Sequence, residues 1–472
     1  KFSNEGEFIE EIGDGADGLN APLDIAASPD QKFAYVADSR NNRITKIQLN
    51  IDEYKTERFD AALKVYSTVS SETSGFTAGD SCEEGEYFEI NVTAKNSDGN
   101  TNIDYKPFGG GKIITDFTGG VIRWEGTGIT DNSASASDNG ATFNESAFTK
   151  GSAKFYARCS ASAGHIKIFI FDNVNSKLKT GAVLKCIPEN VPWGLNFIGT
   201  NPEGFRRYSA VNDPEVKFIK IPGSNFISGN ENAGGTYTEV KMSPYYIAET
   251  LTTNAQFNRW RRHSSNPPPL QGSWSWQNSG SAGPGSDSGN YPDHPAVFIS
   301  YDDAKNYCHW LIRGSNKDQS DSYIPTEAQY EKAGRGANLA GLKNSFEEKR
   351  YPWGNFFSSD SLNSASGNTS DERKISGRAG TTPVNKYRPQ GYYGLYDIAG
   401  NLNTWCRDWY GDTYPAARID PCNAVPRPLK AVRGGSWNAD SFSCMTSSRH
   451  GASPMFYAHD DVGIRPCVSP IK

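Results

Sequence analysis

The chain has 472 residues, of which 36% are hydrophobic and 22% charged, with a net charge of -6 and many Gly (47), Tyr (23) and Phe (24) residues. Its length suits about three domains, and its composition is typical of a turn-rich, aromatic globular protein. The sequence has no Lys/Arg cluster and no apolar run near the ~20 residues of a membrane-spanning helix, so nucleic-acid binding and a membrane span are not expected.

Residues 1–50 are expected to form short strands, because "EFIEEI" and "RITKIQL" alternate and "KFAYVAD" is rich in β-formers. The segment "YVADSRNNRITKI" resembles one repeat of an NHL-type β-propeller. A single blade cannot bury both faces, since repeat architectures depend on neighbouring repeats. The resemblance therefore implies that the blade packs on the next domain, completes a sheet in a partner, or has sibling repeats in a missing N-terminal part.

Residues 51–186 are predicted to form a β-sandwich, because short alternating strands are separated by turn signals such as "NSDGN" and "FGGGK". The stretch from "FEINVTAKN" to "HIKIFIFD" resembles the Ig-like repeats of bacterial and archaeal surface proteins, which usually act as spacers. Cys82 lies just before one strand and Cys159 just after another. A disulfide between these two cysteines across the sandwich is therefore one expectation.

Residues 187–472 contain three helix signals. Capping-box patterns predict helices that begin near Asn254 and Thr326, and Ser300 is the expected N-cap of a third helix. A long Pro-, Gly- and Ser-rich loop between the helix near Asn254 and the helix capped by Ser300 carries Trp274 and Trp276. These two rings either tuck against the domain or form a contact surface.

The segments "HPAVFISYDDAKNYCHWL", "GYYGLYDIAGNLNTWCRDWY", "AVRGGSW" and "VGIRPC" occur in this order. Together with "IPTEAQYEKAGRG" and "YPWGN", they make residues 187–472 resemble the formylglycine-generating enzyme and sulfatase-modifying-factor family. The resemblance implies a C-type-lectin-like fold. The expected architecture is thus multi-domain, mainly β plus α+β. That family's scaffold serves a copper oxidase, an iron-dependent sulfur-transfer enzyme and non-catalytic binders, among them the variable proteins of diversity-generating retroelements.

The enzymatic alternatives fit the residues poorly. The family's oxidase holds copper with two thiolates, which a soft Cu(I) ion prefers; here Cys444 matches the second cysteine, but Ala439 stands at the first. The sulfur-transfer enzymes need a His cluster, and the six His of this chain form no H-x-x-x-H pair. A family calcium site uses a Glu where this chain has Thr404, and a second would use Asn363. We therefore expect no catalytic residue and no cofactor, with calcium left open.

The eight cysteines contain no C-x-x-C pair, which favours disulfides in an oxidising compartment over metal knuckles; buried free thiols are the alternative. The family resemblance implies a bridge between Cys308 and Cys467. Three cysteines precede residue 187 and five follow it, so both parts have an odd number. Full pairing therefore needs one disulfide between the two parts, and Cys186 is suggested as one of its two cysteines.

These features favour a non-enzymatic extracellular or cell-surface protein that binds a protein or glycan. Small polar and aromatic residues, the composition of antibody-type binding surfaces, follow the Gly-Gly-Ser-Trp turn. The predicted ligand-binding face contains Asn438, Asp440, Ser441, Phe442, Ser443, Phe456, Tyr457, His459 and Asp460, with Trp274 and Trp276. A structural subunit of a filament or appendage, assembled through the N-terminal β segment, is the alternative, and a copper oxidase is a distant third.

Overall fold

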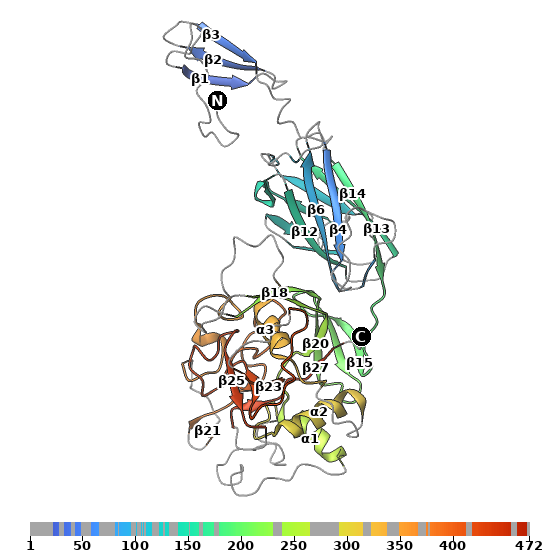
Figure 1. The fold of residues 1–472 in the computed structure, drawn as a ribbon, viewed down its shortest axis with the longest axis vertical. Helices are drawn as coiled ribbons and strands as arrows, with labels where there is room; N and C mark the ends of the chain where they lie inside the picture. The colour runs from blue at the N-terminus through green and yellow to red at the C-terminus, as the bar shows by residue number, and fades with distance from the viewer. Residues whose placement is uncertain are drawn as a thin grey trace.

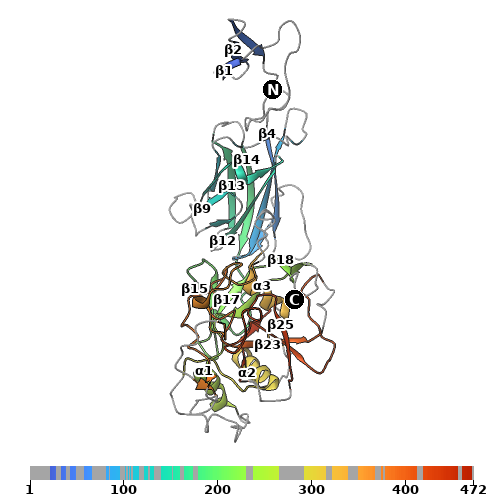
Figure 2. The same ribbon diagram turned by 90° about the vertical axis from the view of Figure 1, so that its left-hand side faces the viewer.

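The computed structural model describes residues 22–27, 33–38, 43–48 and 58–65, residues 81–229 with short gaps, and then 238–264, 292–314, 322–337, 349–366, 374–375, 378–411, 418–454 and 460–469. The described part is mainly β, with few helices. Figures 1 and 2 show three bodies along the long axis: a small N-terminal sheet, a central β-sandwich, and a larger C-terminal body that carries the helices.

The N-terminal body is one antiparallel sheet in the order β1-β2-β3, formed by Pro22–Ala27, Phe33–Asp38 and Arg43–Gln48. The strands expected in "KFAYVAD" and "RITKIQL" are therefore confirmed, whereas "EFIEEI" lies outside the described residues. Among the described strands, β1 to β3 pair only with one another. Their assignment as an NHL-type blade stays a prediction.

The central body is a sandwich of two sheets, in the orders β5-β14-β13-β7-β10-β9 and β11-β12-β6-β4, with β8 paired to β12. Its strands are β4 (Arg58–Val65), β5 (Ser81–Glu83), β6 (Tyr87–Lys95), β7 (Gly111–Thr115), β8 (Ile122–Glu125), β9 (Ile129–Asp131), β10 (Ala141–Phe143), β11 (Phe148–Thr149), β12 (Ser152–Cys159), β13 (Gly164–Asp172) and β14 (Lys179–Ile187). The alternation in "FEINVTAKN" sets the core, because Phe88, Ile90, Val92 and Ala94 are fully buried against residues of the facing sheet such as Ile168.

The C-terminal body is built on a five-stranded sheet in the order β15-β16-β17-β20-β27, so the last strand of the chain pairs with one near the start of this body. A four-stranded sheet, β25-β24-β23-β26, and two strand pairs complete it. Its strands are β15 (Leu195–Thr200), β16 (Arg206–Ala210), β17 (Lys217–Ile221), β18 (Ser224–Ser228), β19 (Thr238–Met242), β20 (Tyr245–Ala248), β21 (Lys374–Ile375), β22 (Arg378–Ala379), β23 (Asn403–Trp409), β24 (Lys430–Arg433), β25 (Arg449–Ala452), β26 (Val462–Gly463) and β27 (Cys467–Val468).

The three predicted helices are confirmed. Helices α1 (Asn254–His263) and α3 (Glu327–Arg335) begin with complete capping boxes, and Ser300 caps α2 (Tyr301–Arg313) through its side chain. Each cap satisfies backbone N–H groups that would otherwise lack a partner at the helix start. Helix α2 buries nearly its whole length in the core, against residues of β16, β17 and β23.

A buried ionic cluster joins the sandwich to the C-terminal body. The Lys220 ammonium of β17 lies 2.8 Å from Glu86 of the sandwich and 2.9 Å from Glu189 of the linker. Arg206 of β16 contacts the other oxygen of Glu189 at 2.8 Å. Although burial opposes it, the Lys220 charge lowers the pKa of Glu189, so the carboxylate stays charged. Beside this cluster, the Tyr87 and Tyr392 hydroxyls hydrogen-bond across the same junction at 2.6 Å.

We predict that Lys220→Met destabilises the protein by about 3–5 kcal/mol, because the buried Glu86 loses its ion-pair partner and Glu189 loses one of its two cations. Calorimetry of the full chain should show a lowered unfolding transition and a separate unfolding of the sandwich. Lys217→Met is the matched control, since Lys217 lies on the same strand but is only half-buried. Equal effects of the two substitutions would contradict the role of this cluster.

Candidate functional site

The segment between Arg433 and Arg449 is a loop held at both ends by helix α3. Arg433, the last residue of β24, donates from Nη2 to Glu331 at 2.7 Å. Arg449, the first residue of β25, donates from Nη2 to Glu327 at 2.6 Å. Both carboxylates are fully buried, and they lie one helical turn apart on the same face. The start and the end of the loop are therefore fixed to one rigid element.

The Gly-Gly turn that opens the loop depends on close packing against Cys444. Gly435 has φ +75, and a Cβ at this position would lie 2.5 Å from the Cys444 sulfur. Glycine is therefore required both by the backbone conformation and by the space. The following Trp437 is buried and donates from its indole to the Asp460 carbonyl at 3.1 Å. Asp460, a predicted face residue, thus lies beside the start of the loop.

The middle of the loop presents an exposed aromatic ring on a tied backbone. Phe442 is 64% exposed, Asn438 and Asp440 are exposed, and Ser441 and Ser443 are half-buried. The Ser443 amide donates to the Asp440 carboxylate at 2.7 Å, and this hydrogen bond lowers the pKa of Asp440. The backbone on both sides of Phe442 is therefore ordered, and a charged carboxylate stands next to the ring.

Further contacts fasten the same segment to the body. The Tyr351 hydroxyl donates to the Ser441 carbonyl at 3.0 Å, and the Ser441 amide donates to the Ser366 hydroxyl at 3.1 Å. The structure therefore brings together the five predicted residues of 438–443 and Asp460. The other predicted face residues, Phe456, Tyr457, His459, Trp274 and Trp276, lie outside the described residues, so their part in the face stays a prediction.

A neighbouring aromatic segment was missed by reasoning from the sequence. Tyr351 stacks on Trp353, with ring centroids 5.4 Å apart, and Phe356 is 86% exposed. The Thr446 amide donates to the Arg350 carbonyl at 2.8 Å, which holds this segment beside the loop. The aromatic density of "YPWGNFF" is the sequence signal that could have indicated this segment.

Cys444 does not have the environment of a metal-binding thiolate. It is fully buried, and burial raises its pKa to about 12. Ala439 packs against the same small core, at the position where the family resemblance implies the first cysteine. One protonated thiol and one methyl group do not fit copper held by two thiolates. No group of three or more His, Cys, Asp and Glu side chains suited to a metal occurs among the described residues.

The residues at the predicted calcium positions are engaged with the protein itself. Thr404 is fully buried and offers a hydroxyl where the family has a carboxylate. The Asn363 amide donates to the Gly380 carbonyl at 2.8 Å, and the Asn401 amide donates to Asp397 at 3.0 Å. Burial raises the pKa of Asp397 to about 7. These residues do not form a complete set of charged oxygen ligands; the expectation of no cofactor, with calcium left open, stays a prediction.

Cys308 and Cys467 are both buried thiols in this structure, on α2 and β27. Burial and then the neighbouring Cys467 raise the pKa of Cys308 well above its usual value, so the two sulfurs lie in one environment. Their disulfide stays a prediction.

In the sandwich, the register places Cys186 beside Cys82 in the parallel pair β5–β14. Cys159 ends β12 in the opposite sheet. A bridge between Cys82 and Cys186 would exclude both the predicted Cys82–Cys159 bridge and the suggested bridge from Cys186 to another unit.

Comparison with known proteins assigns the C-terminal body. Residues 207–470 match the model of the sulfatase-modifying factor enzyme 1-like domain, and the chain belongs to this family. The formylglycine-generating enzyme of Thermomonospora curvata is 34% identical over 175 residues, 34% of this chain and 50% of that protein. The chain thus spans half the length of this relative. The inactive C-alpha-formylglycine-generating enzyme 2 of Bos taurus is 29% identical over 302 residues, 55% of this chain and 89% of that protein.

Two solved structures also align with the chain. Treponema denticola variable protein 1 has a TM-score of 0.40 and 21% identity, over 54% of this chain and 95% of its own. PvdO from Pseudomonas aeruginosa has a TM-score of 0.41 and 18% identity, over 59% of this chain and 98% of its own.

We predict that Glu331→Gln lowers the free energy of unfolding by about 3–5 kcal/mol, because the buried Arg433 and the largely buried Arg335 lose the charge of the carboxylate that they share. Arg433 then keeps only its longer ion pair with Glu327, at 3.4 Å. Urea unfolding of the full chain measures this loss. The control is Glu215→Gln, an ion-pair carboxylate that is 73% exposed, which should cost about 0–1 kcal/mol. If Glu331→Gln proves as mild as its control, α3 does not hold the loop through charge.

Proposed function

We propose that this chain is a non-catalytic ligand-binding or adhesion protein, which acts outside the cell or at its surface. The observation that carries the proposal is the 64% exposed Phe442 ring on a loop fixed at both ends by buried ion pairs. A rigid aromatic side chain provides contact area at low entropic cost when a ligand binds. The polar neighbours Asn438 and Asp440 would add hydrogen bonds around it.

A binding role agrees with the chemistry of the loop. The thiol of Cys444 is buried and protonated, and its expected partner is Ala439. Two relatives are named as inactive, although others are named as formylglycine-generating enzymes. Copper-dependent oxidation of a cysteine is therefore the less favoured alternative. We propose that ligand binding needs no cofactor, with calcium left open.

The proposed ligand is a protein or a glycan, since the face combines one large ring with small amide, hydroxyl and carboxylate groups. The proposed location rests on the eight cysteines, an even number without a C-x-x-C pair, because disulfides form and persist in oxidising compartments. None of the helices in the described ranges has the length and apolar character that crossing a membrane would require.

We predict that Phe442→Ala weakens binding to a glycan or protein identified on arrays by at least about tenfold, as expected for an aromatic anchor worth about 2 kcal/mol. The matched control is Val425→Ala, because Val425 is 66% exposed elsewhere on the same body. Unchanged affinity of Phe442→Ala would place the site elsewhere. Conversion of a cysteine peptide to an aldehyde only when copper is added would instead support the oxidase.

A second proposed role is a structural subunit of a surface appendage, with β1–β3 as an NHL-type blade and the sandwich as an Ig-like spacer. The observation that favours it is the small sheet itself: its strands pair with no other described strand, and it stands at one end of the molecule (Figure 1). A sheet of this size needs a covering layer for stability. A partner's sheet would supply that layer and add main-chain hydrogen bonds.

If the N-terminal sheet mediates assembly, the full chain should form dimers or larger species in a concentration-dependent manner. Light scattering coupled to size-exclusion chromatography measures the mass directly. A truncated chain that starts at residue 51 should remain monomeric under the same conditions. A monomer at all concentrations of the full chain would contradict this second role.

A further inference from the structure

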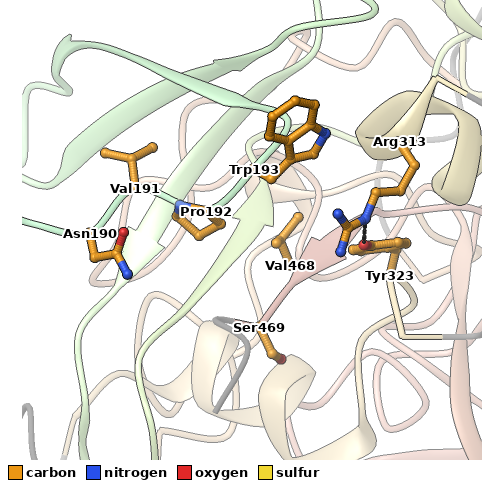
Figure 3. Close-up of a pocket in the computed structure, with 8 residues that line it drawn as sticks. All are labelled: Asn190, Val191, Pro192, Trp193, Arg313, Tyr323, Val468 and Ser469. Atoms are coloured by element: carbon orange, nitrogen blue, oxygen red, sulfur yellow. Dashed lines mark hydrogen bonds between the residues drawn. The ribbon is translucent and has the colours of Figure 1, made fainter.

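A cavity on the C-terminal body is lined by none of the residues of the Phe442 loop. Its volume is about 150 Å³, and Figure 3 shows its lining. The wall comes from four separate places: the linker that follows β14, the C-terminal end of α2, the segment before α3, and β27 with the residue after it. The lining residues are Asn190, Val191, Pro192, Trp193, Arg313, Tyr323, Val468 and Ser469.

The linker packs closely on the end of α2, and Trp193 and Arg313 both line the cavity. Gly194 has φ +89, and a Cβ there would lie 2.3 Å from the Ile312 carbonyl oxygen. This contact requires glycine and holds the residue before it at the helix end. Trp193 is 73% exposed, so its indole face is open to a ligand at the rim of the cavity. The close approach of Gly194 to Ile312 thus fixes the linker side of the pocket relative to the α2 side.

The charge of the pocket is positive and lacks compensation from within. The Arg313 guanidinium donates from Nε to the Tyr323 hydroxyl at 2.6 Å, which orients the group, and Figure 3 shows this bond. None of the eight lining residues is acidic. Within the described ranges, no carboxylate lies within ion-pair distance of Arg313. Its two terminal nitrogens are therefore the groups suited to a carboxylate, which Arg binds through two parallel hydrogen bonds.

We propose that this pocket binds a sugar ring that bears a carboxylate, that is, a hexuronate-type acidic sugar. The carboxylate would pair with Arg313, and the apolar face of the ring would lie on Trp193 and Pro192. The amide of Asn190 and the hydroxyl of Ser469 would meet the sugar hydroxyls. A cavity of about 150 Å³ has room for one six-membered ring, since an engineered cavity of that size holds benzene.

This inference does not depend on the proposed ligand face, because the two sites share no residue. The expected ligand has three groups: a carboxylate for the guanidinium, an apolar ring face for the indole, and hydroxyls for the amide and the serine. A neutral sugar lacks the first of these groups, and an aromatic acid lacks the third. Those two compounds therefore separate the contributions of charge and of hydroxyl recognition.

The test is calorimetric titration of the full chain with glucuronate, glucose and benzoate. We expect glucuronate to bind most tightly. Arg313→Met should weaken glucuronate binding at least about tenfold, because a hydrogen bond to a charged group is lost. Trp193→Ala should weaken glucuronate and glucose alike. Arg388→Met is the control, since Arg388 is an exposed arginine outside the lining.

Three results would overturn the proposal. The first is glucuronate that binds no more tightly than glucose, which removes the role of charge. The second is benzoate that binds as tightly as glucuronate, which points to a general site for apolar acids. The third is full glucuronate affinity in Arg313→Met that keeps the unfolding temperature of the parent. Arg313 is exposed at the end of α2, so its replacement should leave the fold intact.

Discussion

The buried carboxylate pair of helix α3 is the interaction on which the candidate site depends. Glu331 accepts hydrogen bonds from Ser228 and from the Gly229 amide, and it pairs with Arg433. Glu327 pairs with Arg449. Removing charges from water is costly, and the cost is offset only where each charge meets a partner of opposite sign with good geometry. The helix therefore positions β18, β24 and β25 together, because a shift of any one would leave a charge uncovered.

Buried ion pairs also hold the junction between the C-terminal body and the sandwich. Lys220 neutralises Glu86 from one body and Glu189 from the linker, while Arg206 covers the second oxygen of Glu189. Arg158 of the sandwich adds a second contact, since its guanidinium lies 3.8 Å from the centroid of the Phe205 ring. The linker that follows is thus held at Glu189 on one side and at Gly194 on the other. The position of Trp193 between them follows from these two anchors.

Local features of the fold could be predicted from the sequence, because their causes are local. The capping boxes at Thr253 and Thr326 and the alternation from Phe88 to Ala94 act within a few residues. The ion pairs could not be predicted, since Glu331 and Arg433 are 102 residues apart and Glu327 and Arg449 are 122 apart. The position of the exposed loop after the Gly-Gly turn could be predicted only from a family motif, "AVRGGSW". No such motif marks Trp193 and Arg313.

The residues packed under the loop, Cys444 and Ala439, bear on whether the loop could hold copper as the family's oxidase does. A reactive thiolate needs solvent or a nearby cation, yet Cys444 is buried under the Gly435 turn, where its pKa rises to about 12. Ala439 fills the neighbouring position with a methyl group that packs on the same core. These two positions therefore do not offer a pair of exposed thiolates, whereas the loop above them has a rigid frame. Such a frame, with an exposed ring at Phe442, still satisfies what binding requires: a fixed contact with little entropy to lose.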